Sequence, residues 1–245
     1  LVGENPASQS YVRAKKKASS EIGLSSEVIE LPLHTKEEAL LQLINELNND
    51  DRVHGILVQL PLPPHIREQS IIETIDPRKD VDGFHPINIG KMLLGEDTFL
   101  PCTPYGILTM LQSKSIKLEG KHVVVIGRSN IVGKPVGQLL LNENATVTYC
   151  HSKTNNLKQF TQSADILIVA IGKANIIHKE HIKEGAVVID VGVNRTEEGT
   201  LTGDVNFDDI YEKASYLTPV PKGVGPMTIT MLLENTIKAA KGLNK

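Results

Sequence analysis

The sequence predicts an α/β protein with two domains, and its second half reads as a doubly wound parallel sheet. Segments with the composition of strands alternate with segments of helical periodicity along the whole chain. The run GILVQ at residues 55–59 is apolar without alternation, as expected for a parallel strand that is covered on both faces. After PCTP, at residues 101–104, the alternation of helices and strands starts again, which indicates a second domain.

The first half of the chain is expected to contain helices separated by two strands. The stretch SQSYVRAKKKASSEIG predicts a helix that opens near Ser8 or Ser10 and stops at Gly23. Thr35 and Glu38 have the spacing of a capping box before the next helix. The other expected elements are a strand EVIELP at residues 27–32, a helix at 37–49, a strand at 53–64, a helix around 68–75 and a short helix near residue 90.

The second half is expected to follow a regular order of helices and strands. The expected elements are a helix at residues 105–115, strands at 122–127, 145–150, 165–172 and 186–192, helices at 133–143 and around 156–163, a turn with helical character at 178–184, a short strand at 215–220 and a last helix at 228–242. This last helix is expected to return to the first domain. We therefore divide the chain into an N-terminal α/β catalytic domain, residues 1–103 plus 226–245, and a Rossmann-like domain, residues 104–225. The opening LVGENPAS reads as the end of a strand and its loop, so the first domain is expected to lack an N-terminal segment.

The composition argues against several classes of protein. Lysine and arginine number 26 against 29 aspartates and glutamates, a net charge of −3, so no general attraction for nucleic acid is expected. Cys102 and Cys150 are too few for a disulfide scaffold and fit a reducing cytosol, so a cytoplasmic protein is expected. No apolar stretch approaches the roughly 20 residues that a membrane-spanning helix needs. No cluster has the spacing of metal ligands, and no metal site is expected.

The stretch GRSNIVGKP, at residues 127–135, predicts a phosphate-binding loop. It lies between a predicted strand and a predicted helix, where backbone N–H groups and the helix dipole attract anions. Ser129 and Val132 occupy two of the positions that are glycine in the pattern G-x-G-x-x-G. An ordinary turn between strand and helix therefore remains the alternative for this loop taken alone.

The end of the following strand distinguishes between two dinucleotides. In NAD-binding folds an aspartate or glutamate at that position binds the adenosine ribose. Here the strand is followed by His151, Ser152 and Lys153, with no acid, and Arg128 is available from the neighbouring loop. An arginine, a hydroxyl and a lysine suit a 2′-phosphate, so the sequence predicts NADP rather than NAD.

Several polar residues of the first half are candidates for a second site. Tyr11 and Lys15 are four residues apart on a predicted helix and share a face, although a solvated basic helix stays the alternative for Lys15. The two lysines that follow are expected to be solvated. Gln59 lies toward the carboxyl end of a predicted strand, the edge at which α/β folds place ligands, although an amide there can also cap a loop. Asp80 and Asp82, in KDVDG, either bind a ligand or only shape a turn.

Eight segments together resemble one protein family in their order and spacing. They are YVRAK, GILVQLPLP, KDVDGFHPIN, PCTP, GRSNIVGKP, CHSKT, GDV and TPVPKGVGPMT, and they cover essentially the whole chain. The chain thus resembles the bifunctional methylenetetrahydrofolate dehydrogenase/cyclohydrolase family. This resemblance implies oxidation of 5,10-methylenetetrahydrofolate by NADP⁺ to the methenyl cation, followed by hydrolysis of the cation to 10-formyltetrahydrofolate.

The same resemblance assigns roles to individual residues. It implies that Lys15 is the principal catalytic residue, that Tyr11 lines the folate site and that Gln59 tunes Lys15. Asp82 is implied to anchor the pterin ring. The implied NADP contacts are Gly127, Arg128, Ser129, Ser152 and Val193, and the segment 219–228, with Pro219 and Gly223, is implied to line the folate side of a cleft between the domains. The family pattern also implies a homodimer and a last helix that packs on the first domain.

One position departs from the family pattern. The segment that usually reads PVPGGVGP has Lys222 in place of the first glycine. If this position needs a positive φ, lysine destabilises the loop by about 1 kcal/mol or more. The alternatives are a monofunctional NADP-dependent methylenetetrahydrofolate dehydrogenase and a folate- or nucleotide-binding protein without turnover. Lys15 together with Gln59 argues against the first, and the complete set of four site residues argues against the second.

Overall fold

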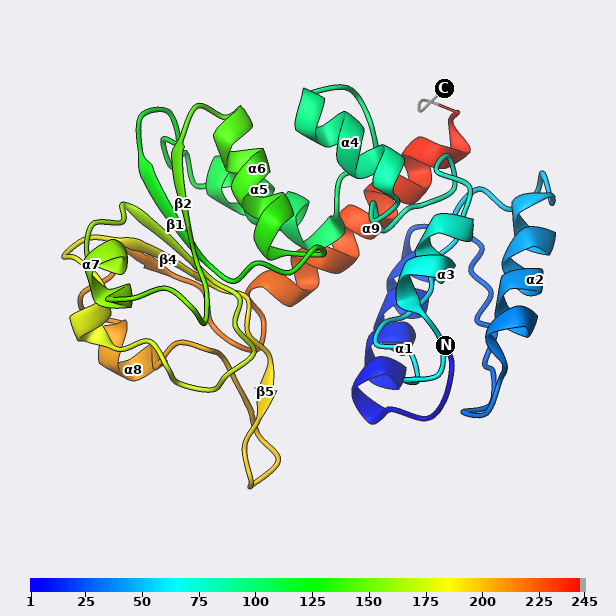
Figure 1. Ribbon diagram of the computed structural model, residues 1–245, viewed down its shortest axis with the longest axis horizontal. Helices are drawn as coiled ribbons and strands as arrows, with labels where there is room; N and C mark the ends of the chain where they lie inside the picture. The colour runs from blue at the N-terminus through cyan, green and yellow to red at the C-terminus, as the bar shows by residue number, and fades with distance from the viewer. Residues whose placement is uncertain (243–245) are drawn as a thin grey trace. The chain divides into compact units, whose positions relative to one another are not determined.

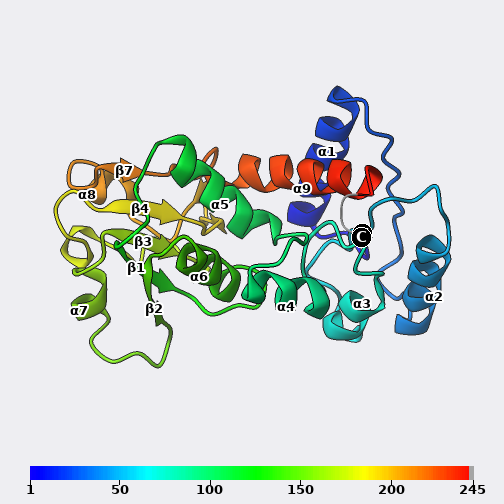
Figure 2. The same ribbon diagram turned by 90° about the horizontal axis from the view of Figure 1, so that it is seen from above.

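The computed structural model describes residues 1–242, and the chain forms two compact units. Unit 1 consists of Leu1–Leu100 and Ile229–Lys245, and unit 2 consists of Pro101–Thr228. The sheet strands lie in unit 2, whereas unit 1 contains helices joined by irregular segments (Figures 1 and 2). Among the described residues, no helix combines the length and the apolar character that crossing a bilayer requires.

Unit 2 is built on a parallel sheet with the strand order β2-β1-β3-β4-β7. The strands are β1 (His122–Ile126), β2 (Thr146–Cys150), β3 (Ile166–Val169), β4 (Val187–Asp190) and β7 (Tyr216–Leu217). The register pairs Ile126 with Cys150 and with Val169, so the carboxyl ends of three strands lie at one edge. The order of the strands reverses between β1 and β3. The predicted doubly wound parallel sheet is therefore confirmed.

Helices cover both faces of this sheet, with α5 and α6 on one side and α7 and α8 on the other (Figures 1 and 2). They are α5 (Cys102–Ser113), α6 (Gly133–Asn142), α7 (Leu157–Thr161), the 3₁₀ helix η1 (Lys179–His181) and α8 (Phe207–Ile210). Val124, Leu167 and Val188 pack with Ile182 and Ile210 in one apolar core. Burial on both faces explains why these strands read as continuous apolar runs. The hairpin of β5 (Asn194–Arg195) and β6 (Leu201–Thr202) is not among the predicted elements.

Unit 1 has a helical core. Its helices are α1 (Pro6–Glu21), α2 (Glu37–Asn48), α3 (Glu68–Thr74), α4 (Pro86–Leu94) and most of α9 (Val224–Ala240). Leu40 and Ile44 of α2 pack with Ile71 of α3. Val2 and Ile56 also belong to this cluster, so irregular segments of the chain are anchored against the helices through buried side chains.

The two strands predicted in the first half are wrong. Leu31 of EVIELP makes a single parallel bridge to Val2, and Ile56 of GILVQ makes a single parallel bridge to Asp80. Around each bridge the chain has no regular secondary structure. A strand of a sheet needs a series of hydrogen-bonded pairs with a neighbouring strand. An apolar run in the sequence does not show whether such a neighbouring strand is present.

Helix α1 begins earlier than predicted. The predicted start near Ser8 or Ser10 is wrong, because Asn5 caps the helix through Oδ1, which accepts two backbone N–H groups of the first turn. Pro6 stands at the first helical position, where its missing N–H leaves no bond unmade. The predicted stop at Gly23 is confirmed, since this glycine has φ +79 just beyond the helix end.

Helix α2 has no capping box, so this part of the prediction is wrong. Thr35 Oγ1 donates a hydrogen bond to Pro32 O at 2.7 Å, and the hydroxyl is thereby directed away from the helix. Lys36 precedes the helix, and its side chain makes no capping bond. Glu37 and Glu38 in the first turn favour this helix end through the helix dipole instead.

Helix α9 begins in unit 2 and ends in unit 1. Asn235 Nδ2 donates hydrogen bonds to the carbonyl oxygens of Val81 and Leu100, at 2.9 and 3.0 Å. Lys238 Nζ donates to the carbonyl oxygen of Thr98 at 2.8 Å. These bonds tie the last part of the described chain to unit 1.

Candidate functional site

The loop after β1 approaches its neighbours so closely that two positions require glycine. Gly127 has φ +135, and a Cβ atom there would collide with the carbonyl oxygen of Ala170, the residue after β3. A Cβ atom at Gly133 would lie 2.6 Å from the backbone of Gly127. These two glycines therefore make the tight turn that the pattern G-x-G-x-x-G makes in other dinucleotide folds.

Ser129 shapes this loop. Its Oγ accepts hydrogen bonds from the backbone N–H groups of Val132 and Gly133, each at 3.2 Å, at the amino end of α6. The hydroxyl proton stays available as a donor, so Ser129 can hold the loop and also contact a phosphate.

Arg128 and Ser152 occupy matching positions in the loops that follow two neighbouring strands, β1 and β2. The register pairs Ile126 of β1 with Cys150 of β2, and each candidate residue follows this pair by two positions. Both side chains are exposed. Val193 is 57% exposed and follows β4 at the same edge of the sheet. The predicted NADP contacts therefore lie in loops at the carboxyl edge, on both sides of the point where the strand order reverses.

The turn after β2 suits a phosphate. His151 N–H donates to Thr154 Oγ1 at 2.9 Å, and Lys153 N–H donates to His151 Nδ1 at 3.1 Å. The turn contains no acid, and the side chain of Lys153 is exposed next to Ser152. With the guanidinium of Arg128, the groups present fit the 2′-phosphate of NADP.

In unit 1, the structure brings Lys15, Gln59 and Tyr11 together. Lys15 Nζ donates a hydrogen bond to Gln59 Oε1 at 3.1 Å. Gln59 Nε2 donates to Leu60 O at 2.7 Å, which orients the amide. Lys15 Nζ also lies 5.8 Å from the centroid of the Tyr11 ring, one turn earlier on α1. Burial raises the pKa of Tyr11 above its ordinary value, so the phenol stays protonated at neutral pH.

Helix spacing explains which lysine of the basic run faces inward. Ser8 and Ser19 are buried and lie on the same face of α1 as Lys15. Lys15 is half-buried, whereas Lys16 and Lys17 are exposed, so the predicted solvation of these two lysines is confirmed. Lys15 is therefore the lysine of this run that the helix presents to the cluster.

Asp80 and Asp82 have different surroundings. Asp80 is 2% exposed, and its carboxylate accepts hydrogen bonds from the backbone N–H groups of Phe84 and His85, at 3.2 and 2.8 Å. It also accepts one from Asn88 Nδ2 at 2.8 Å. Asp80 therefore holds the turn. Both acids line one narrow cavity, but Asp82 is half-buried and therefore more accessible than Asp80, so it stays the candidate for contact with a ligand.

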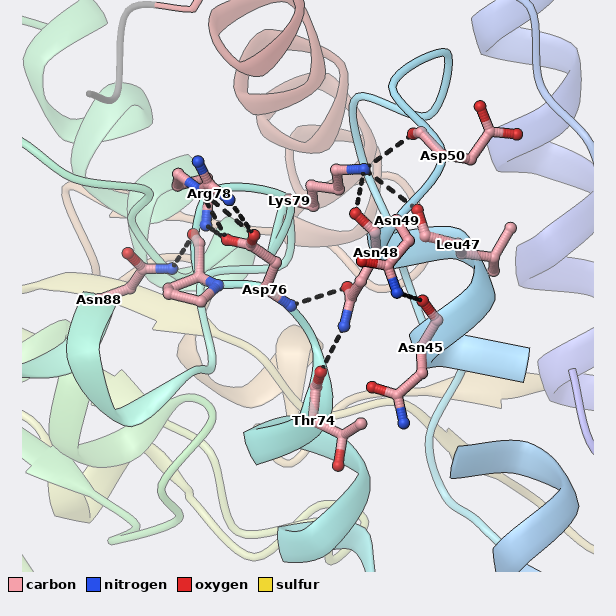
Figure 3. Close-up of polar contacts among 11 residues, drawn as sticks. Asn45, Leu47, Asn48, Asn49, Asp50, Thr74, Asp76, Arg78, Lys79 and Asn88 are labelled. Carbon is pink, nitrogen blue, oxygen red and sulfur yellow. Dashed lines mark hydrogen bonds and ion pairs between the residues drawn. The ribbon is translucent and has the colours of Figure 1, made fainter. Parts of the chain in front are cut away.

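Lys79 fixes the start of the same turn (Figure 3). Its Nζ donates to the carbonyl oxygens of Leu47, Asn48 and Asp50, at 3.1, 2.8 and 2.9 Å. Carbonyl groups at the end of a helix lack helical partners, and a cation there is favoured by the helix dipole. Lys79 O in turn accepts the backbone N–H of Ile56 at 2.7 Å. Lys79 thus links the end of α2 to the segment that leads to Gln59 and to the segment that leads to Asp82.

The segment after β7 contains the departure from the family pattern. Lys222 has φ +83, so this position does lie in the region that favours glycine. Gly223 is buried, and a Cβ atom there would collide with the carbonyl oxygen of Pro219. Pro219 and Gly223 belong to unit 2, whereas the other predicted folate residues belong to unit 1.

We expect Lys222→Gly to raise the free energy of unfolding by about 0.5–1 kcal/mol. Relief of left-handed strain, about 1–2 kcal/mol, outweighs the additional backbone entropy that glycine loses on folding. Urea unfolding followed by circular dichroism measures the change. Lys222→Ala is the control, because alanine keeps the Cβ atom. Equal gains for the two variants would show that strain at this residue is not the cause.

Two buried acids of unit 2, Asp190 and Asp204, are not among the predicted site residues. They are 3% and 0% exposed. Burial raises the pKa of Asp190 to about 6, although three backbone N–H donors act in the opposite direction. The sequence signal for Asp190 is an acid at the end of the apolar run AVVI, whereas Asp204 lies in the segment GDV, which contributed only to the family resemblance. Within residues 1–242, no group of acids, histidines or cysteines has the geometry to hold a metal ion.

Comparisons with known proteins identify the family of both parts of the chain. A model of the tetrahydrofolate dehydrogenase/cyclohydrolase catalytic domain matches residues 1–82, and a model of the NAD(P)-binding domain of the same family matches residues 101–244. The bifunctional protein FolD of Oceanobacillus iheyensis is 70% identical over 244 residues, which make up 100% of this chain and 86% of that relative.

Solved structures show the same similarity. The bifunctional FolD methylenetetrahydrofolate dehydrogenase/cyclohydrolase of Campylobacter jejuni has a TM-score of 0.97 at 55% identity, over 99% of this chain and 86% of that chain. The FolD of Trypanosoma brucei, solved in complex with NADP cofactor and inhibitor, has a TM-score of 0.94 at 40% identity, over 99% and 85% of the two chains. The chain described here therefore belongs to the tetrahydrofolate dehydrogenase/cyclohydrolase family.

Proposed function

We propose that this protein is a bifunctional enzyme of folate-linked one-carbon metabolism. It oxidises 5,10-methylenetetrahydrofolate to the 5,10-methenyl cation with NADP⁺ and hydrolyses the cation to 10-formyltetrahydrofolate. The hydrogen bond between Lys15 and Gln59 carries the proposal, because a positioned amine serves the hydrolysis and oxidation alone does not require one.

The oxidation depends mainly on orientation. The carbon that loses a hydride is bonded to two nitrogens, which stabilise the resulting cation, so no side chain has to supply a proton. Bound NADP⁺ supplies the hydride acceptor. The residues that hold it are Gly127, Arg128, Ser129, Ser152 and Val193, from the loops after β1, β2 and β4.

The hydrolysis requires proton transfer. Water adds to the methenyl carbon and loses a proton, the bond from this carbon to N5 breaks, and N5 takes up a proton. Lys15 Nζ moves a proton during these steps, and Gln59 Oε1 holds Nζ in place. The ring of Tyr11 forms a wall for the folate, and Asp82 anchors the pterin ring.

Separate assays of the two reactions test this function. NADPH absorbance after mixing methylenetetrahydrofolate with NADP⁺ reports the oxidation. Loss of methenyl absorbance without nucleotide reports the hydrolysis. Oxidation without hydrolysis would identify a monofunctional dehydrogenase, and binding without either reaction would identify a protein without turnover. Both results would overturn the bifunctional assignment.

We expect Asp82→Ala to raise the KM for folate, or to abolish turnover, in both reactions while the Kd of NADP⁺ stays unchanged. The substitution removes the charged acceptor for the N–H groups of the pterin ring, and the residues that hold NADP⁺ lie in unit 2. Steady-state kinetics of both reactions and calorimetric titration with NADP⁺ measure these quantities.

Asp80→Ala is the comparison for this prediction. It removes the acceptor of three hydrogen bonds in the turn, so its first effect is expected on stability. If folded Asp80→Ala loses folate binding and Asp82→Ala keeps it, Asp80 is the anchor and the assignment of Asp82 is wrong.

The proposal includes a homodimer that works in the cytoplasm. Cys102 and Cys150 are buried and form no disulfide, which suits a reducing compartment. The family resemblance supports the homodimer. Size-exclusion chromatography with light scattering measures the mass in solution, and a monomeric mass at micromolar concentration would contradict the dimer.

A further inference from the structure

One buried carboxylate joins two loops at the carboxyl edge of the unit 2 sheet. Asp204 Oδ2 accepts hydrogen bonds from the backbone N–H groups of Ile171 and Gly172, at 2.6 and 2.9 Å. Asp204 Oδ1 accepts one from the backbone N–H of Lys173 and one from Asn194 Nδ2, each at 2.9 Å. The loop after β3 and the loop after β4 are therefore held by the same side chain.

Asp190 holds Asp204 in turn. Its carboxylate accepts the backbone N–H groups of Gly192, Asp204 and Val205, at 2.9, 3.0 and 2.9 Å. A Cβ atom at Gly192 would collide with the carboxylate of Asp204, and one at Gly203 would collide with that of Asp190. The backbone thus surrounds both carboxylates and fixes their positions.

The loop after β3 borders the predicted phosphate loop. Ala170 N–H donates to Ile126 O at 2.8 Å, and the carbonyl oxygen of Ala170 lies so close to Gly127 that it would collide with a Cβ atom there. In dinucleotide folds the two halves of the ligand lie on opposite sides of the point where the strand order reverses. Arg128 and Ser152 follow β1 and β2, on the adenosine side. The nicotinamide half of NADP⁺ is therefore expected to bind at the loops after β3 and β4.

We propose that Asp204 is a positioning residue for NADP⁺, because its carboxylate holds the loops after β3 and β4 in the conformation that receives the nicotinamide half. This inference rests on the NADP site proposed above. Four hydrogen-bond donors to one buried carboxylate fix the loops before the cofactor binds. The loops therefore lose less conformational entropy when NADP⁺ binds.

Asp204→Asn tests this role with little change in side-chain size. One amide oxygen replaces two carboxylate oxygens, so two of the four donors lose their acceptor whichever way the amide turns. We expect the Kd of NADP⁺ to rise about 10-fold or more. The Kd of adenosine 2′,5′-bisphosphate, which contains the adenosine half only, is expected to stay unchanged. Hydrolysis of methenyltetrahydrofolate without nucleotide is also expected to stay unchanged. Calorimetric titration measures both dissociation constants.

Asp165→Asn is the matched control. Asp165 precedes β3 at the opposite edge of the same sheet, where its carboxylate accepts the backbone N–H of His122 and the ammonium of Lys183. The variant Asp165→Asn carries the same chemical change within unit 2. We expect it to bind NADP⁺ and adenosine 2′,5′-bisphosphate with the Kd values of the wild type. Loss of NADP⁺ affinity in this control as large as in Asp204→Asn would overturn a specific role for Asp204.

Asn194→Ala provides a milder variant that keeps the test decisive if Asp204→Asn does not fold. It removes a single donor, and we expect a smaller rise in the Kd of NADP⁺ with unchanged binding of adenosine 2′,5′-bisphosphate. Wild-type NADP⁺ affinity in these folded variants would overturn the proposal. Equal losses for NADP⁺ and for the adenosine half would also overturn it, because they indicate a general structural defect. Failure of the wild-type protein to bind NADP⁺ would instead overturn the cofactor site, and this inference with it.

Discussion

Lys15→Met is expected to slow the hydrolysis of methenyltetrahydrofolate at least about 100-fold and to slow NADPH formation less. Methionine keeps an unbranched stem and removes the ammonium group that donates to Gln59 Oε1. The hydrolysis then lacks its proton carrier. Hydride transfer depends on how substrate and nicotinamide are oriented, and the folate can still dock against the Tyr11 ring.

The two rates are measured separately, as decay of methenyl absorbance without nucleotide and as NADPH formation at saturating substrate. Lys16→Met is the matched control, because Lys16 is the next residue of α1 and its side chain is exposed. We expect both of its rates to stay near those of the wild type. Wild-type hydrolysis by a folded Lys15→Met protein would move proton transfer to another residue and leave Lys15 as a surface charge.

Arg128→Ala is expected to weaken NADP⁺ binding about 10- to 100-fold and to leave NAD⁺ binding nearly unchanged. The bond from a guanidinium to a phosphate is assisted by charge, and only NADP⁺ carries the 2′-phosphate. The register pairs Ile126 with Cys150, and exposed Arg128 and exposed Ser152 each follow this pair by two positions, so we expect one phosphate to contact both side chains.

Calorimetric titration of wild type and variant with both nucleotides measures this discrimination. Arg195→Ala is the control, since Arg195 lies in the β5–β6 hairpin and donates through Nη1 to Gly199 O. This variant removes the same positive charge from unit 2, so it measures how much NADP⁺ affinity falls through the general loss of positive charge alone. Equal losses of the two nucleotides in Arg128→Ala would refute the assignment.

The sheet of unit 2 was accessible from the sequence because its central strands are buried on both faces. The residues on either side of Val124 and of Leu167 are also buried, so the sequence of these strands is an uninterrupted apolar run. The hairpin at residues 194–202 was missed, since each of its strands has two residues and its side chains are mostly exposed. A short exposed strand leaves no periodic pattern to detect.

Local patterns were less reliable in unit 1. Asn5 and the following proline form a sequence signal for a helix start, but Ser8 and Ser10 are equally good caps by residue type. Thr35 and Glu38 have the spacing of a capping box, and the structure uses the Thr35 hydroxyl for the preceding turn. The choice among competing caps depends on where the neighbouring chain lies, which the local sequence does not contain.

The candidate sites were predictable to different degrees. Tyr11 and Lys15 meet through helix spacing alone, whereas Gln59 reaches Lys15 across 44 residues, and only the family resemblance predicted that contact. Asp80 and Asp82 share one motif and differ in burial, so the sequence could not separate a turn-forming carboxylate from a ligand-binding one. Asp204 binds backbone N–H groups of residues more than 30 positions away. Every residue except proline has such a group, so the sequence does not show which ones Asp204 binds.

The division of helix α9 between the units makes unit 1 discontinuous along the chain. Unit 2 is one continuous stretch, Pro101–Thr228, whereas unit 1 needs Ile229–Lys245 in addition to its first hundred residues. The carbonyl oxygen of Leu100 receives its side-chain donor only when Asn235 has been translated, 135 residues later. Domains usually fold in the order in which they leave the ribosome. Here the first residues of unit 1 are translated before unit 2 and its last residues after it, so a chain that ends at residue 228 contains all of unit 2 and lacks part of unit 1.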